Sequence, residues 1–127
     1  MSNKRIQMDN HHLYHFTSRK NADSIKHDGY IKANFPHNGQ ANMPFGVYLT
    51  QETPYNKVNN IFENNFDDLT RNWNTYGLLV DRLEVAFKFK KQDLIDAGAF
   101  QNTKTNRNEW IFPKNLSLDK CVKIEEK

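Results

Sequence analysis

The sequence contains a single cysteine, Cys121, among its 127 residues. One cysteine excludes a disulfide within the chain and a zinc site built from cysteines, and it is typical of a reducing compartment. The sequence also has no run of 18 or more apolar residues, and residues 1–5 lead into polar sequence rather than an apolar signal core. We therefore expect a cytoplasmic protein without a membrane partner.

A strong excess of one charge is also absent. Lys and Arg number 18 against 15 Asp and Glu, which gives a formal net charge of +3. This mild positive charge is compatible with a phosphate-bearing ligand or a nucleic acid but does not identify one, because an electrostatic footprint requires the charges to cluster. The lysines Lys88, Lys90 and Lys91 come closest to a cluster, and we interpret them as the solvated end of a strand.

Several motifs of common enzyme classes are missing as well. The chain has no glycine loop for phosphate, no Gly-x-Ser-x-Gly turn and no His-Glu-x-x-His helix. His11, His12 and His15 are close in sequence, but His12 and His15 would point to opposite faces of a strand and no carboxylate is expected beside them. We expect no metal site. Cys121 lies in an apolar stretch, which favours an inert buried thiol over a nucleophile.

What the sequence contains predicts one α+β domain over residues 13–127, preceded by a flexible segment at 1–12. The order of elements lacks regular βαβ alternation, so the sheet should be largely antiparallel. Thr17 and Ser18 can cap a helix that Gly29 ends, and an exposed loop is expected at 34–44. The patterns predict helices at 20–28, 55–73 and 92–97, and strands at 13–16, 30–31, 45–50, 78–89, after Gly98, 108–113 and 118–124.

Three polar residues lie in these apolar strands: His15 in Leu-Tyr-His-Phe-Thr-Ser, Tyr48 in Gly-Val-Tyr-Leu-Thr, and Glu109 in Asn-Glu-Trp-Ile. Each alone has an ordinary structural explanation. A histidine in a strand usually finds a hydrogen bond, a tyrosine after glycine usually packs, and a glutamate before tryptophan usually occupies an exposed position of the alternation. Only their combination points to chemistry.

Together, and in this order, the three segments resemble the H-Y-E class of mono-ADP-ribosyltransferases, the diphtheria-toxin and PARP-like group. The chain is most similar to the small bacterial or phage toxin-type domains of that group, which open with a Leu-Tyr-His-Tyr-Thr-Ser-like strand, here residues 13–18. A Gly-x-Tyr-Leu-Thr strand followed by proline corresponds to 46–54, and a late Glu-Trp-Ile strand to 109–111. The resemblance covers about 13–125 and implies a catalytic domain folded as a split β-sandwich of two mostly antiparallel sheets with a few short helices.

The resemblance implies a transferase that cleaves the nicotinamide–ribose bond of NAD and transfers ADP-ribose to a protein or nucleic-acid acceptor, as toxins and effectors do, without a metal. Bond cleavage passes through an oxocarbenium-like state, which a carboxylate near the ribose stabilises as positive charge develops. A tyrosine ring would hold the nicotinamide, and a histidine would orient the ribose. The implied catalytic residues are His15, Tyr48 and Glu109, the NAD-binding residues are His15, Phe16, Thr17, Tyr48 and Tyr55, and Arg107 is a candidate on the acceptor side.

Two positions depart from the family pattern. Phe16 replaces the usual tyrosine, and because both rings pack similarly we expect activity to survive. Arg107 stands two residues before Glu109, where the arginine-modifying branch has Glu or Gln, and its charge would repel a guanidinium, so we expect that arginine is not the acceptor.

Other readings of the same residues stay open. The related NAD-dependent removal of an RNA phosphate would need more basic residues around the pocket. A small ribonuclease could use His15 and Glu109 as acid and base without NAD. A module that binds NAD or ADP-ribose without turnover would have no need for a carboxylate near the ribose, and therefore none for Glu109.

Overall fold

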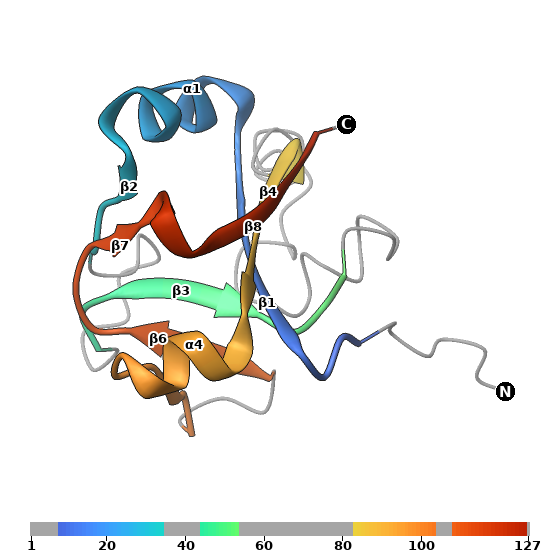
Figure 1. Ribbon diagram of the computed structural model, residues 1–127, viewed down its shortest axis with the longest axis vertical. Coiled ribbons are helices and arrows are strands. Elements are labelled where there is room, and N and C mark those ends of the chain that lie inside the picture. Colours follow the sequence, from blue (N-terminus) through green and yellow to red (C-terminus); the bar gives the residue numbers. More distant parts are fainter. Residues whose placement is uncertain (1–7, 35–43, 54–82, 104–107, 127) are drawn as a thin grey trace, which may run out of the picture.

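The computed structural model describes residues 8–34, 44–53, 83–103 and 108–126 (Figure 1). The helix expected at 55–73 and most of the loop expected at 34–44 lie outside these ranges, as do Tyr55 and Arg107. Within them the structure is α+β, as the sequence predicts, and its strand pairings are antiparallel.

Six strands form the main sheet, in the order β5-β6-β3-β1-β4-β8, and β2 pairs with β7 in a small second sheet. In this order non-consecutive segments of the chain lie side by side, so β1 runs between β3 and β4 (Figure 1). The strands are β1 (His12–Thr17), β2 (Tyr30–Ile31), β3 (Val47–Thr50), β4 (Val85–Lys90), β5 (Phe100–Gln101), β6 (Glu109–Phe112), β7 (Leu116–Ser117) and β8 (Cys121–Glu126).

Helix α1 (Arg19–Asp28) follows the local signals of the sequence. The Ser18 side chain accepts a hydrogen bond from the Asn21 amide at the first turn. Gly29 ends the helix in the left-handed conformation, with φ at 83°, and its amide bonds the Ile25 carbonyl. A second helix, α4 (Lys91–Asp96), follows β4 directly. Within the described ranges, neither α-helix has the length and apolarity needed to span a bilayer.

One face of the main sheet forms the hydrophobic core. Alternate residues of β4, namely Val85, Phe87 and Phe89, are fully buried, and they pack with Leu13 of β1 and Leu49 of β3. Successive side chains of a strand point to opposite faces of the sheet. The residues between the core residues of a strand therefore point to the face opposite the core. The residues that carry the candidate chemistry on β3 and β6 belong to that other face.

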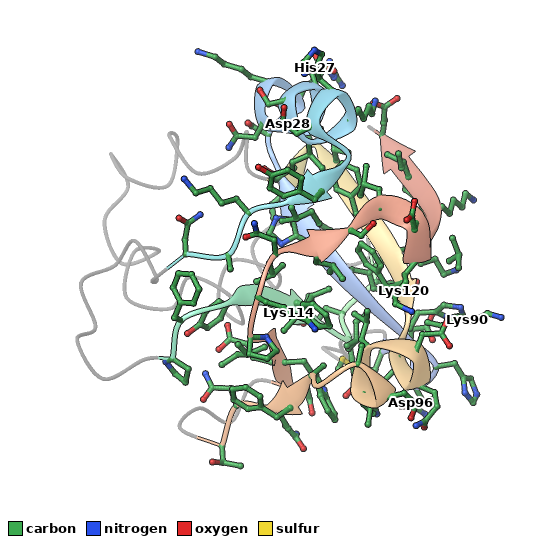
Figure 2. All side chains as sticks on the ribbon, turned by 60° about the vertical axis from the view of Figure 1, so that its left-hand side comes forward. His27, Asp28, Lys90, Asp96, Lys114 and Lys120 are labelled. Atoms are coloured by element: carbon green, nitrogen blue, oxygen red, sulfur yellow. The ribbon has the colours of Figure 1, made fainter. Side chains whose placement is uncertain are left out.

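Apart from the buried Glu52 and Glu109, the described charged side chains are partly or fully exposed, with both signs interspersed. Lys90 and Lys120 are exposed and flank the paired residues Phe89 and Cys121, and Asp96 on α4 is exposed as well (Figure 2). At the end of α1, His27 and Asp28 are exposed and their side chains are 3.2 Å apart. Lys90 is thus an exposed strand end, whereas Lys88 and Lys91 are partly buried.

The last predicted strand differs from the structure at its start. Residues 118–120 form a 3-10 turn, η2 (Leu118–Lys120), and extended structure begins at Cys121. The Ser117 hydroxyl accepts a hydrogen bond from the Asp119 amide, which turns the chain before β8. The two-residue strand β7 before this turn, which pairs with the predicted strand β2, was not predicted.

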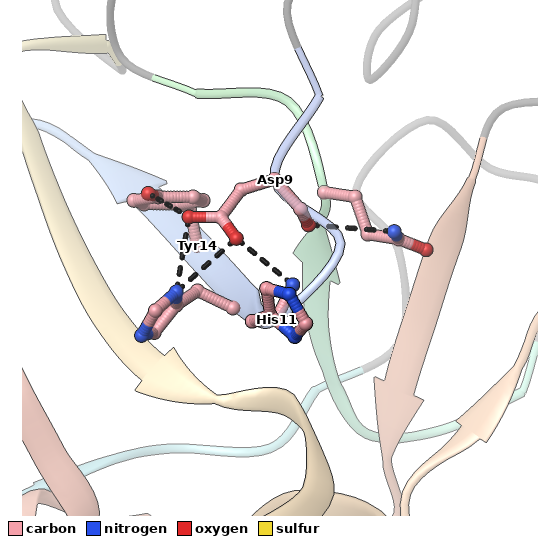
Figure 3. A network of polar contacts seen from close by, with 5 residues as sticks. Asp9, His11 and Tyr14 are labelled. Atoms are coloured by element: carbon pink, nitrogen blue, oxygen red, sulfur yellow. Dashed lines mark hydrogen bonds and ion pairs between the residues drawn. The ribbon is translucent and has the colours of Figure 1, made fainter.

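Residues 8–12, which the sequence assigns to a flexible segment, are attached to the sheet. Met8 forms a bridge with Glu52, the Asp9 amide donates to the Gln51 carbonyl at 2.8 Å, and β1 already begins at His12. The Asp9 carboxylate accepts hydrogen bonds from the His11 amide and the Tyr14 hydroxyl, and it contacts the His12 ring (Figure 3).

Candidate functional site

The sheet order places the strands of His15, Tyr48 and Glu109 next to one another. They are β1, β3 and β6, which are adjacent in the order β6-β3-β1. Thr50 of β3 is paired with both neighbours, with Tyr14 on one side and with Glu109 on the other. His15 and Glu109 are 94 positions apart in the sequence, and strand pairing places them on either side of the strand that carries Tyr48.

Strands β1 and β3 diverge at the candidate site. Their register contains the single pair Tyr14 with Thr50, whereas β1 and β4 pair over six residues. In Figure 1 the C-terminal end of β3 meets β1, and the rest of β3 lies away from β1 at a steep angle. Where the two backbones separate, the His15 ring bridges them, because its Nδ1 lies 2.9 Å from the Tyr48 carbonyl oxygen.

This contact determines the state of the His15 ring. A carbonyl oxygen only accepts, so Nδ1 carries the proton and donates, and the neutral ring keeps its acceptor lone pair on Nε2. Burial lowers the pKa of His15 below its ordinary value of 6.5, although the hydrogen bond to Tyr48 partly opposes that shift. At neutral pH the ring is therefore an uncharged acceptor.

Glu109 is a buried carboxylate, with 5 % of its surface exposed. The expectation that a glutamate before tryptophan would be exposed is wrong, because Glu109 follows Asn108 at the start of β6 and faces Thr50 of β3, which is 1 % exposed. Asn108 has a φ of 56°, a left-handed conformation that asparagine tolerates better than most residues. The Asn102 side-chain amide donates to Glu109 Oε1 at 2.8 Å.

Tyr48 and Glu109 share one face of the sheet. Tyr48 stands two residues before Thr50, the partner of Glu109, so the side chains of all three point the same way. Burial, together with the negative charge of Glu109, raises the pKa of Tyr48 to about 12. The Tyr48 hydroxyl donates a hydrogen bond to the Pro44 carbonyl, which fixes the ring at its far end.

The remaining predicted residues are less closely grouped. Thr17 is buried and lies on the His15 side of β1, whereas Phe16 points to the opposite face and lies 6.4 Å from the Tyr14 ring. Tyr55 and Arg107 lie outside the described residues. The structure thus places His15, Tyr48 and Glu109 on adjacent strands. The register puts the His15 side chain on the face of Leu13 and Phe87, and those of Tyr48 and Glu109 on the other, so the link of His15 to the other two is its contact with the Tyr48 main chain. All of the site assignments stay predictions.

Two polar residues near the site were missed by the sequence analysis. Asn102 contacts Glu109 only because the hairpin of β5 and β6 pairs them, and the sequence carries no signal for that pairing. Asp9 lies beside His12, so the view that no carboxylate accompanies the early histidines is wrong. Although burial acts to raise it, the pKa of Asp9 is lowered by hydrogen bonds from the His11 amide and the Tyr14 and His12 side chains (Figure 3). Among the described residues no group of three or more His, Cys, Asp or Glu side chains could hold a metal ion.

The electrostatic contact between Glu109 and Tyr48 can be tested without an activity assay. Replacing Glu109 with Gln removes the charge, so the pKa of Tyr48 should fall from about 12 toward its ordinary value of 10.0 while burial keeps it above that value. Ultraviolet difference titration of tyrosinate would measure the shift, with Tyr48→Phe identifying the signal among five tyrosines. Identical titration curves for wild type and Glu109→Gln would show that the two groups are not neighbours.

Comparisons of the chain with protein-family models, with curated proteins and with solved structures found no match.

Proposed function

We propose that the protein is an NAD-dependent mono-ADP-ribosyltransferase. The observation that carries this proposal is that His15, Tyr48 and Glu109 lie on three adjacent strands, with the His15 ring bonded to the main-chain carbonyl of Tyr48 and the Tyr48 and Glu109 side chains on one face. The resemblance of the sequence to the H-Y-E class names the same three residues. A buried carboxylate is also costly to a fold, which favours a functional explanation for Glu109.

We also infer that the sheet corresponds to the split β-sandwich of that class. The divergence of β1 and β3 after one residue pair supports this proposal, because it divides the main sheet into a β5-β6-β3 part and a β1-β4-β8 part. The ligand would bind along this division. There Phe16 and Thr17, directly after His15, would contact NAD.

In the proposed reaction the bond between ribose C1′ and the nicotinamide nitrogen breaks, and its electron pair leaves with nicotinamide. The carboxylate of Glu109 hydrogen-bonds the ribose 2′-hydroxyl and stabilises the positive charge that develops on the ribose. A nucleophile of the acceptor then bonds to C1′ and loses its proton. Because Glu109 is buried, its charge acts through little water, where it is most effective.

Tyr48 and His15 position NAD for that step. The Tyr48 ring would lie against the nicotinamide, and its hydroxyl is held by the Pro44 carbonyl, so the ring is already oriented before NAD arrives. The Nε2 lone pair of His15 would accept a hydrogen bond from a ribose hydroxyl, because Nδ1 is committed to the Tyr48 carbonyl. The acceptor is a protein or a nucleic acid, and arginine side chains are not the modified group if Arg107 faces it.

The pKa of His15 predicts how NAD binding depends on pH. Lowering the pH through the depressed pKa of His15 protonates Nε2 and removes the acceptor, so the KM for NAD should rise only below pH 6.5. The variant His15→Asn keeps a donor for the Tyr48 carbonyl but has no group in place of Nε2. It should show a KM about threefold to tenfold higher, without the acid rise. Initial rates over a range of NAD concentration and pH measure both effects, and an unchanged acid rise in His15→Asn would contradict the assignment.

The direct test is nicotinamide release from NAD by the purified protein, with and without cell lysate as a source of acceptor. We expect release in both conditions and faster release with lysate. RNA cleavage without NAD would instead support the ribonuclease, and NAD binding without release would support the binding module.

A further inference from the structure

Asn102 contacts Glu109 through both its side chain and its main chain. It directly follows β5 and is buried, with 4 % of its surface exposed. Its side-chain nitrogen donates to Glu109 Oε1 at 2.8 Å, and its main-chain amide donates to the Glu109 carbonyl at 2.8 Å. The second bond fixes Asn102 relative to the backbone of Glu109, so the first bond fixes the carboxylate relative to that same backbone.

An amide donor suits a carboxylate that must keep its charge. A hydrogen bond from a neutral group favours the ionised form of an acid. A lysine or arginine in the same place would also favour ionisation, but its own charge would oppose the field of the carboxylate at the ribose. Asn102 therefore offsets part of the cost of burying Glu109 and leaves the net charge of the pair at −1.

The contact also fixes direction. A glutamate carboxylate rotates freely about its last bond unless an oxygen is held, and the direction of Oε2 follows once Oε1 is bound. Asn108, in its left-handed conformation, sets the backbone of Glu109 from the other side of the hairpin. Both ends of the loop between β5 and β6 therefore contribute to the placement of a single side chain.

We propose that Asn102 is the positioning residue of Glu109, which keeps the carboxylate ionised and aimed at the ribose. This inference rests on the proposed function. Asn102 does not need to touch NAD, and it acts on the reaction through Glu109.

The test replaces Asn102 with Asp and with Ser. Asn102→Asp is nearly isosteric but loses the donor and adds a second carboxylate, so the two acids should titrate together and the pKa of Glu109 should rise by about one unit or more. The acid limb of nicotinamide release should move to higher pH by the same amount. Asn102→Ser is neutral and too short to reach Oε1, and it should lower kcat by roughly tenfold to a hundredfold with little change in KM for NAD. It covers the case in which Asn102→Asp does not fold.

A matched control adds the same charge elsewhere. Asn115 accepts a hydrogen bond from the Ala33 amide through its side-chain oxygen, which an aspartate also provides, and it is exposed beside β7. Asn115→Asp should leave the pH profile unchanged. If wild type releases nicotinamide but the Asn102 variants match wild type and Asn115→Asp, the positioning role is wrong.

Failure of the proposed function gives a different result. In that case wild type itself releases no nicotinamide. Carbon NMR titration of the Glu109 carboxyl, identified with Glu109→Gln, would still measure its coupling to Asn102. An unchanged Glu109 pKa in Asn102→Asp would overturn the inference whatever the activity of wild type.

Discussion

Nicotinamide release should fall by roughly 10² to 10³ when Glu109 is replaced with Gln, the loss typical of removing one preorganised electrostatic group from a transition state. The amide has nearly the same shape as the carboxylate, and its Oε1 can still accept the hydrogen bond from Asn102. The variant therefore removes the charge and keeps the contact. Because the charge acts only as the ribose becomes positive, kcat should carry the loss and the KM for NAD should change little.

The matched control for this variant is Glu126→Gln. Glu126 is exposed on β8 and pairs with Lys26 at 2.8 Å, far along the sheet order from β6. The Glu126→Gln variant loses the same charge as Glu109→Gln, and its rate of nicotinamide release should equal that of wild type. Rates measured by chromatography of released nicotinamide compare the three proteins. If Glu109→Gln retained the wild-type kcat, the carboxylate would have no part in the reaction.

The second large effect is expected at Gly46, two residues before Tyr48. A Cβ built at Gly46 would lie 2.5 Å from Ile111 Cγ2 and 2.5 Å from the Phe112 carbonyl oxygen. The latter is main chain of β6, so the strand itself must move to admit a methyl group. Gly46→Ala should therefore lower the free energy of unfolding by about 1 to 3 kcal/mol. It should also displace β6 from β3, and a shift of about 1 Å at a reacting group can reduce the rate roughly 10²-fold.

A second glycine separates this effect from loss of stability alone. Gly29 has a φ of 83° and no atom within 4 Å of a built Cβ, so Gly29→Ala costs only the left-handed conformation, about 1 to 2 kcal/mol. It lies at the end of α1, which Figure 1 shows away from β3 and β6. Thermal unfolding and nicotinamide release of both variants would be measured. Equal activity in two equally destabilised variants would show that close packing of β3 on β6 is irrelevant to the site.

The fold was predictable where the signal is local. Ser18 and Gly29 determine both ends of α1 through contacts with residues three or four positions away. The alternation in β4 likewise reflects a property of each strand by itself. Where an element forms only by pairing with a distant strand, the sequence was not sufficient to predict it. The two-residue strand β7 exists only because β2 lies beside it, and no period in its own residues indicates it.

The candidate site shows the same division. The sequence predicts His15, Tyr48 and Glu109 as candidate residues on strands, and the structure has all three on strands. Their surroundings could not be predicted. The burial of Glu109 and its bond to Asn102 depend on the pairing of β5, β6 and β3, which joins segments far apart in the chain. The contact of His15 with a main-chain carbonyl depends on the divergence of β1 from β3.

The most direct test of the central claim follows the two halves of NAD separately. The protein is incubated with lysate and NAD labelled either in the adenine or in the nicotinamide, and the label on macromolecules is counted. The proposed function predicts that adenine label becomes attached in wild type but not in Glu109→Gln, while nicotinamide label stays in the small-molecule fraction. If neither label is transferred and NAD stays intact, the protein is not an ADP-ribosyltransferase.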